Sequence, residues 1–177
     1  VGSEMCIRDS ELKGLYNKRS LNRYLEDVFE ACKLNEKELG ILFLDIDYFK
    51  QLNDRYGHGK GDEGICAVAD TLKRIFPEDY VARYGGDEFL VVMTGRDLTY
   101  VMEHAESLCA GIRECKIPNE DSEVESWLTI SVGGVCAIPK EPNRVWDFLS
   151  AADNTLYEQK KEQKGKVRFY QGEGKYL

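Results

Sequence analysis

The sequence contains, near its middle, the run Arg83-Tyr84-Gly85-Gly86-Asp87-Glu88-Phe89-Leu90-Val91-Val92. Apolar residues on both sides predict two strands, over residues 80–84 and 89–93, and the two glycines between them can take the positive φ angles of a tight hairpin turn. Asp87 and Glu88 therefore lie beside a turn, where two like charges repel unless a cation is shared between them. A divalent metal ion would be such a cation, and an ordinary solvated hairpin tip is the alternative.

A second acidic strand end lies upstream of this turn. Residues 39–46 are almost continuously apolar, which predicts a central strand buried on both faces, and the run Asp45-Ile46-Asp47 closes it. Such a strand end delivers the Asp45 carboxylate to whatever site lies there. Asp47 is a candidate N-cap for a short helix that starts at Tyr48, and the free N–H groups of a helix N-terminus suit phosphate. Lys50 adds a positive charge one turn into that helix.

The remaining elements are predicted from apolar residues at helical or strand spacing. After a turn-like entry over residues 11–19, four longer helices are predicted over residues 20–34, 63–76, 98–115 and 145–164. Two more strands are predicted over residues 127–136 and 167–170. A local hairpin, with other strands joined through helices, predicts an α/β (α+β) domain whose central sheet is mixed, mainly antiparallel and five-stranded, with helices around it.

The polar loop before the helix over residues 63–76 carries a candidate base-binding pair. It contains Asn53, three glycines and Asp62, which would open that helix as its N-cap. An amide and a carboxylate that face one cleft can read guanine, because a carboxylate accepts from both N1–H and the 2-amino group. The alternative is that Asn53 is a loop amide and Asp62 an N-cap only.

The composition restricts the class of protein. A chain of 177 residues with 42% hydrophobic residues predicts one compact domain. A net charge of -8 makes nucleic acid or an anionic membrane surface an unfavourable partner. Six scattered cysteines without a CxxC pair, and two histidines, give little support to a zinc site and favour reduced thiols in the cytoplasm. No apolar run is long enough to span a bilayer, so we expect no membrane contact from this chain itself.

The predicted carboxylate arrangement is typical of one class of chemistry. In palm-type polymerases and class III nucleotide cyclases, a carboxylate at the end of a central strand lies beside others on an adjacent hairpin. Two magnesium ions there activate a 3′-hydroxyl and neutralise a triphosphate, so that the hydroxyl attacks the α-phosphate and pyrophosphate leaves. Magnesium prefers oxygen ligands and keeps phosphates in its shell, so an acidic chain can still hold GTP.

The chain resembles the GGDEF domains, the diguanylate cyclase family, from about Glu11 to Arg168. The resemblance rests on five ordered blocks, over residues 14–19, 43–54, 56–62, 81–89 and 129–133. It implies condensation of two GTP into cyclic di-GMP, with release of two pyrophosphates and with two Mg²⁺ per active site, or Mn²⁺ in their place. Each domain would hold one GTP, so catalysis implies a homodimer. A catalytically idle module that binds GTP or cyclic di-GMP is the alternative.

The resemblance also implies roles for individual residues. Asp87 and Glu88 would be catalytic, with Asp87 as the base for the 3′-hydroxyl. The metal ligands would be Asp45, the carbonyl group of Ile46, Asp87 and Glu88. The residues that hold the phosphates or read guanine would be Phe49, Lys50, Asn53, His58, Asp62, Lys160 and Lys164.

The chain departs from the family pattern in three places. Ser10 stands where Asp is usual, and we interpret residues 1–10 as a non-native or linker leader, residues 11–170 as the domain and residues 171–177 as a tail. The glycine and basic residue that follow the last helix come late, which supports Lys160 as a phosphate ligand better than Lys164. Phe76 replaces the arginine of the product-inhibition motif, so we expect little feedback inhibition by that route. A sensor domain is expected N-terminal to this chain, fused to it or missing from it.

Overall fold

The computed structural model describes residues 15–171. The predicted leader over residues 1–10, and all of the predicted tail except Gln171, lie outside the described residues. In chain order the elements are β1 (Tyr16–Asn17), α2 (Lys18–Leu34), β2 (Leu39–Ile46), α3 (Phe49–Tyr56), α4 (His58–Ile75), β3 (Tyr80–Arg83), β4 (Glu88–Thr94), α5 (Leu98–Glu114), β5 (Ile130–Ala137), α6 (Val145–Glu162) and β6 (Val167–Phe169).

The sheet is mixed and mainly antiparallel, as the sequence predicts, but it has six strands rather than five. Its order is β1-β3-β4-β2-β5-β6, with β2 at the centre between antiparallel neighbours β4 and β5. The hairpin β3–β4 is antiparallel, and the two outer pairs, β1 with β3 and β5 with β6, are parallel. The additional strand is Tyr16–Asn17, which lies in the predicted turn-like entry and has no periodicity of its own because it is only two residues long.

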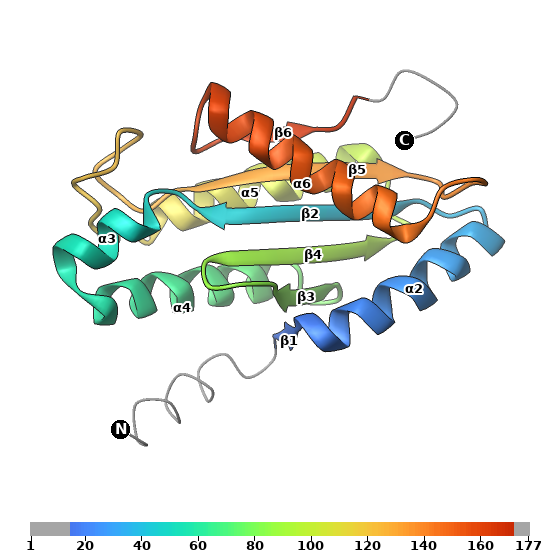
Figure 1. Cartoon of the computed structure of the whole chain (residues 1–177), viewed down its shortest axis with the longest axis horizontal. Helices are drawn as coiled ribbons and strands as arrows, with labels where there is room; N and C mark the ends of the chain where they lie inside the picture. Colours follow the sequence, from blue (N-terminus) through green and yellow to red (C-terminus); the bar gives the residue numbers. More distant parts are fainter. Residues whose placement is uncertain (1–14, 172–177) are drawn as a thin grey trace.

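Helices cover both faces of this sheet (Figure 1), so there are two hydrophobic cores. On one face Leu42 and Leu44 of β2 belong to a core that also contains residues of α4 and α5, and on the other Ile41 and Phe43 belong to a core with residues of α2 and α6. All four side chains are at most 3% exposed. The predicted burial of β2 on both faces is therefore confirmed, and it fixes the strand that carries Asp45 next to its C-terminal end.

Helix α6 lies directly against the backbone of β5. A Cβ atom at Gly133 would lie 2.3 Å from the carbonyl oxygen of Ala152 and 2.3 Å from the nitrogen of Leu156, both in α6. Only glycine permits so close an approach of helix and strand. This contact sets the position of the basic C-terminal turn of α6 over the end of β2.

Three tyrosines fasten β1 and α2 to β3. The ring of Tyr80 lies between those of Tyr16 and Tyr24, with centroid separations of 4.0 and 3.9 Å and interplanar angles of 7° and 8°. Such stacked rings contribute beyond the area that they bury. The start of α2 is thereby held beside the strand that leads into the carboxylate turn.

Candidate active site

The turn between β3 and β4 is held by Arg83. Its Nε donates to the carbonyl oxygen of Gly85 at 3.1 Å and its Nη2 donates to that of Gly86 at 2.6 Å. The predicted positive φ angles are wrong: among the described glycines they occur at positions 57, 95 and 165, and at neither glycine of this turn. A Cβ at Gly85 would lie 2.5 Å from Oε2 of Glu88, so a larger residue there would displace that carboxylate group.

The structure brings the three predicted carboxylates together. Asp45, next to the end of β2, lies directly opposite Glu88 in the register of β2 with β4. The backbone N–H of Ile46 donates to the carbonyl oxygen of Asp87 at 3.2 Å, which ties the turn to the end of β2. The antiparallel pairing of these two strands therefore places the predicted metal ligands at one edge of the sheet.

Asp45 is the most buried of the three, and it is paired with Lys160. The Nζ of Lys160 donates to Oδ2 of Asp45 at 2.6 Å, and the two side chains are 26% and 17% exposed. Burial raises the pKa of Asp45 to about 7; the charge of Asp87 adds to this rise, and Lys160 opposes it. The other oxygen, Oδ1, is buried and has no hydrogen-bond partner among the described residues. A buried carboxylate oxygen without a partner is costly unless a cation or donor approaches it.

Glu88 lies among several charges that come from different elements. Burial raises the pKa of its carboxyl, the charges of Asp87 and Asp153 raise it further, and Lys160 and Lys18 lower it. Lys18 and Asp153 were not among the site residues predicted from the sequence. Lys18 begins α2, and its ammonium lies 4.1 Å from the ring centroid of Tyr84, beside the turn. Lys18 lies in the first of the five blocks that resemble the family, over residues 14–19, and this position could have indicated it.

These residues suit magnesium in their chemistry. The candidate ligands are all oxygen atoms, and the buried Oδ1 of Asp45, which has no hydrogen-bond partner among the described residues, is suited to a cation. Within residues 15–171, no three His, Cys, Asp or Glu side chains form a ready-made metal cage. Magnesium at nucleotide sites is usually held by one or two carboxylates together with substrate phosphates and water.

The N-terminus of α3 lies next to this cluster, but Asp47 does not cap it. The helix follows Tyr48, which takes a left-handed conformation with φ of 53° and gives no side-chain cap. Asp47 is instead fully buried and accepts hydrogen bonds from the hydroxyls of Thr129, at 2.8 Å, and Ser131, at 2.7 Å. The predicted N-cap is therefore wrong, because the neighbouring strand supplies stronger partners.

The predicted phosphate ligands lie around this helix N-terminus. Phe49 is half-buried against the core, and Lys50 is exposed. The ammonium of Lys164, which follows the end of α6, lies 3.9 Å from the ring centroid of Tyr48. The structure thus places Lys164 beside the start of α3, and Lys160 beside Asp45.

The predicted guanine pair lies where α3 meets α4. Helix α4 begins at His58, so Asp62 lies in its second turn and is not the N-cap that the sequence predicted. Oδ1 of Asn53 is buried without a hydrogen-bond partner among the described residues, and a Cβ at Gly61 would lie only 1.9 Å from it. Gly61 therefore leaves the space that the Asn53 amide occupies. His58 itself is exposed.

With this geometry in view, comparison with known proteins gives the family. The family whose sequence model matches residues 9–166 is described as "Diguanylate cyclase, GGDEF domain". The chain belongs to the GGDEF diguanylate cyclase family. The crystal structure of the GGDEF domain of DgcB from Caulobacter crescentus, in complex with c-di-GMP, is similar to it with a TM-score of 0.81 and 25% identity, over 91% of this chain and 94% of that one.

Curated relatives of this GGDEF domain are longer proteins. The chain is 33% identical over 158 residues to the probable diguanylate cyclase DgcC of Escherichia coli K12, which is 89% of this chain and 41% of that protein. It is 30% identical over 159 residues to an uncharacterized membrane protein of Staphylococcus saprophyticus, again over 89% of this chain and 44% of the relative. The chain thus spans less than half the length of these relatives. In residues 15–171, no helix combines the length and the apolar character needed to cross a membrane.

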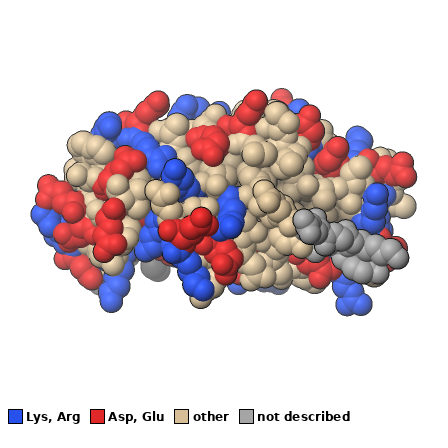
Figure 2. Space-filling model, turned by 90° about the horizontal axis from the view of Figure 1, so that it is seen from above, with Lys and Arg blue, Asp and Glu red and all other residues tan. Residues whose placement is uncertain are grey.

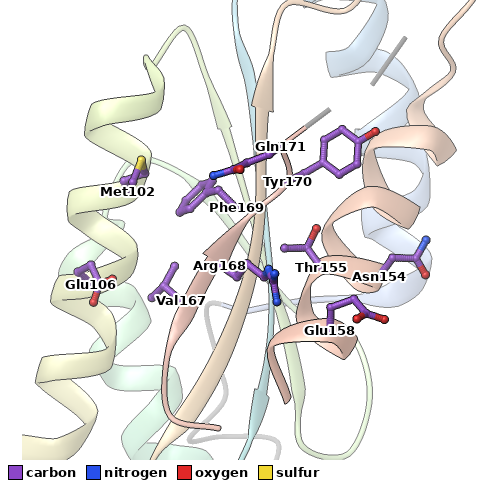
Figure 3. A pocket seen from close by; sticks show the side chains of 10 residues that line it. All are labelled: Met102, Glu106, Asn154, Thr155, Glu158, Val167, Arg168, Phe169, Tyr170 and Gln171. Carbon is purple, nitrogen blue, oxygen red and sulfur yellow. The ribbon is translucent and has the colours of Figure 1, made fainter. Parts of the chain in front are cut away.

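The GGDEF domain has another hollow, away from the carboxylate cluster. It has a volume of about 560 Å³ and lies along β6 between α5 and α6, as Figure 3 shows. Its lining includes Met102, Glu158 and Phe169, and none of the predicted site residues. Acidic and basic side chains are interspersed over the face seen in Figure 2. The candidate active site is thus defined by its functional groups rather than by the depth of a cavity.

Proposed function

We propose that this chain is a diguanylate cyclase domain, which joins two GTP molecules into cyclic di-GMP and releases two pyrophosphates. The observation that carries the proposal is the meeting of Asp45, Asp87 and Glu88 where β2 ends beside the hairpin, with one buried oxygen of Asp45 left without a partner. Membership of the family and the retention of the matching site residues support it.

Binding of GTP is assigned to two groups of residues. The uncapped N-terminus of α3, with Lys50 and Lys164, holds the triphosphate, because free backbone N–H groups and ammonium groups favour phosphate. Asn53 and Asp62 read the guanine edge, and His58 shapes the opening of that pocket. Lys160 balances the charge of Asp45 before substrate arrives.

The reaction joins the 3′-oxygen of one GTP to the α-phosphate of the other. Asp45, the Ile46 carbonyl, Asp87 and Glu88 would hold two Mg²⁺, or Mn²⁺, which when bound neutralise the triphosphate and lower the pKa of the attacking hydroxyl. Asp87 accepts the proton of the 3′-hydroxyl. The bond from the α-phosphate to the bridging oxygen breaks, and pyrophosphate leaves.

Two copies of the domain are needed for one product. Each domain supplies one GTP, and each 3′-hydroxyl attacks the α-phosphate of the nucleotide held by the other domain. The two-fold symmetry of cyclic di-GMP follows from a two-fold arrangement of the sites. A homodimer is therefore part of the proposal.

The test is to incubate the purified chain with GTP and Mg²⁺ and to identify products by mass spectrometry. Cyclic di-GMP should form, should be lost on chelation of the metal, and should fall by at least about a hundredfold in Asp87→Asn, which removes one charge at constant shape. Asp70→Asn is the matched control, because that carboxylate lies on α4 with a side chain 75% exposed. Product from Asp87→Asn at the wild-type rate would remove Asp87 from the mechanism.

A negative result has a defined second step. If the wild-type chain forms no product, it is fused to a dimeric coiled coil and the assay is repeated. GTP binding without turnover in that fusion would overturn the cyclase and identify an idle binding module.

A further inference from the structure

We propose that Ser131, which is held by the buried carboxylate of Asp47 and accepts a hydrogen bond from Gly165, is a positioning residue that keeps Lys164 over the N-terminus of α3 and thereby strengthens binding of the GTP phosphates. The inference rests on the proposed function, since it assigns to Lys164 a phosphate of the same substrate. It concerns a buried carboxylate that the proposed reaction does not use.

Asp47 is the centre of a closed hydrogen-bond network. Its side chain is fully buried and accepts from the hydroxyls of Thr129 and Ser131, at 2.8 and 2.7 Å. Its backbone N–H donates to the carbonyl oxygen of Thr129 at 2.9 Å, and its own carbonyl accepts from Nδ2 of Asn119 at 3.4 Å. A carboxylate that is removed from water needs such partners, so its position is fixed by all of them together.

Ser131 passes this constraint to the loop after α6. Its hydroxyl oxygen, which donates to Asp47, also accepts from the backbone N–H of Gly165 at 3.0 Å. The carbonyl oxygen of Gly165 accepts from Nη2 of Arg113, whose Nε donates to Glu125 at 2.7 Å. Gly165 has a φ of 76°, and a Cβ there would lie 2.7 Å from Cγ1 of Val124. Hydrogen bonds to its N–H and to its carbonyl group therefore fix the backbone of Gly165, directly after Lys164.

The hydrogen-bond network fixes the backbone beside both Tyr48 and Lys164, whose side chains contact each other. Tyr48 follows Asp47 in the chain, and Lys164 precedes Gly165. The ammonium of Lys164 lies 3.9 Å from the ring centroid of Tyr48, at the residue before α3 begins. The chain of contacts thus runs from Asp47 through Ser131 and Gly165 to Lys164, and returns through Tyr48. Loss of the Ser131 link would release the cation from the helix N-terminus.

The protein offers a matched pair of hydroxyls to test this. Thr129 and Ser131 each donate one hydrogen bond to the Asp47 carboxylate, and only Ser131 also accepts from Gly165. Thr129→Val and Ser131→Ala therefore remove similar support from Asp47, whereas Ser131→Ala alone frees the backbone beside Lys164. A purely structural role of Asp47 predicts equal effects from the two variants.

The experiment measures the binding of three probes to the wild type, both hydroxyl variants, Lys164→Ala and the double variant Ser131→Ala/Lys164→Ala. The probes are GTP with a non-cleavable α–β bridge, inorganic triphosphate and guanosine. Ser131→Ala should weaken binding of the first two by about tenfold, as expected for one charge-assisted contact, and leave guanosine within about twofold. Thr129→Val should stay within about twofold for all three. The double variant should bind no more weakly than Lys164→Ala, because residues that act through one contact are not additive.

Activity gives a second readout of the same assignment. Ser131→Ala should raise the KM for GTP while leaving kcat within about threefold, because an interaction made equally in ground and transition states changes KM alone. Equal effects of Thr129→Val and Ser131→Ala, or additive effects of Ser131→Ala and Lys164→Ala, would overturn the proposal. Binding of inorganic triphosphate tests the positioning role separately from the proposed function. If the variants show the expected affinities for triphosphate but the chain makes no product, the positioning role is upheld and only the cyclase activity is rejected.

Discussion

The position of the Asn53 side-chain amide depends on the lack of a Cβ atom at Gly61, on the facing helix α4. Its Oδ1 lies where a Cβ of residue 61 would stand, 1.9 Å away, and it has no hydrogen-bond partner among the described residues. An unpartnered buried acceptor is a group kept ready for a ligand or a water molecule. Gly61 is thus as much a part of the proposed guanine pocket as Asn53.

Gly61→Ala should therefore weaken GTP binding by at least about tenfold, because the Asn53 amide must move and a buried polar contact is lost. Gly59→Ala is the control on the same helix, since a Cβ there would have no atom within 4 Å. That change should leave binding within about twofold and raise stability by up to about 1 kcal/mol, the usual gain of alanine over glycine in a helix. Titration calorimetry and urea unfolding give the two quantities. Equal GTP affinity in the two variants would count against the pocket.

Single residues were predictable where strand geometry alone fixes them. The end of a buried strand and the register of a hairpin determine where Asp45 and Glu88 lie, and the structure brings them together as expected. Asp47 and Asp62 were misjudged as N-caps. Each has the right residue type for a cap, but Asp47 meets two hydroxyls from a strand about eighty residues away, and local sequence carries no sign of that contact.

At the scale of elements, the contact of α6 with β5 positions the cations of the site. Helix α6 approaches the backbone at Gly133, and two turns further on it carries Lys160, whose ammonium binds Asp45 at 2.6 Å. The helix therefore both covers one hydrophobic core and carries the counter-charge to the largely buried carboxylate of Asp45.

Gly133→Ala should destabilise the fold by about 2–3 kcal/mol, because the added methyl would overlap the helix backbone, which cannot move alone. Gly134→Ala is its neighbour and control: a Cβ there would lie 2.5 Å from the ring of Phe169, a side chain that can turn aside, so we expect about 1 kcal/mol. Urea unfolding measures both. Residual Gly133→Ala activity should also fall, since Lys160 moves with the helix. A smaller loss for Gly133→Ala than for Gly134→Ala would contradict the proposed packing.

Elements with strong periodicity were predicted closely, and weakly patterned ones were not. Strand β2 matches its predicted bounds, and α5 differs from them by one residue. Helix α4 begins five residues earlier than predicted, because Gly57, Gly59 and Gly61 read as a loop although the latter two are helical. The strand β1 was missed because a pair of residues shows no alternation, and only its pairing with β3 defines it.

At the scale of the whole molecule, one domain contains one set of the residues proposed to bind and activate GTP. Asp45, Asp87 and Glu88 form one cluster beside the N-terminus of α3, which has no side-chain cap. Cyclisation joins two nucleotides at two phosphates, so a lone domain can hold half of the reacting groups. The sequence predicts this requirement from the symmetry of the product, and the cluster of Asp45, Asp87 and Glu88 would supply one half of it.

Specific activity should therefore rise with protein concentration. While most of the chain is monomeric, the rate per molecule should increase about in proportion to concentration, because the active species is a dimer. A coiled-coil fusion should remove that dependence and raise activity in dilute samples. Rates measured over a hundredfold dilution series check this, with size-exclusion chromatography on the same samples. A constant specific activity in a chain that stays monomeric would overturn the two-domain reaction.

The brevity of the two outer strands bears on how such copies can meet. Strand β1 has two residues and β6 has three, so each outermost strand offers only a few backbone donors and acceptors for pairing with another molecule. Long exposed margins invite the sheets of neighbouring molecules to join, which leads to aggregation. The short outer strands of this domain therefore offer little surface for such joining of sheets. If the proposed reaction requires copies of the domain to meet repeatedly, the short outer strands let them do so with little tendency to form fibrous assemblies.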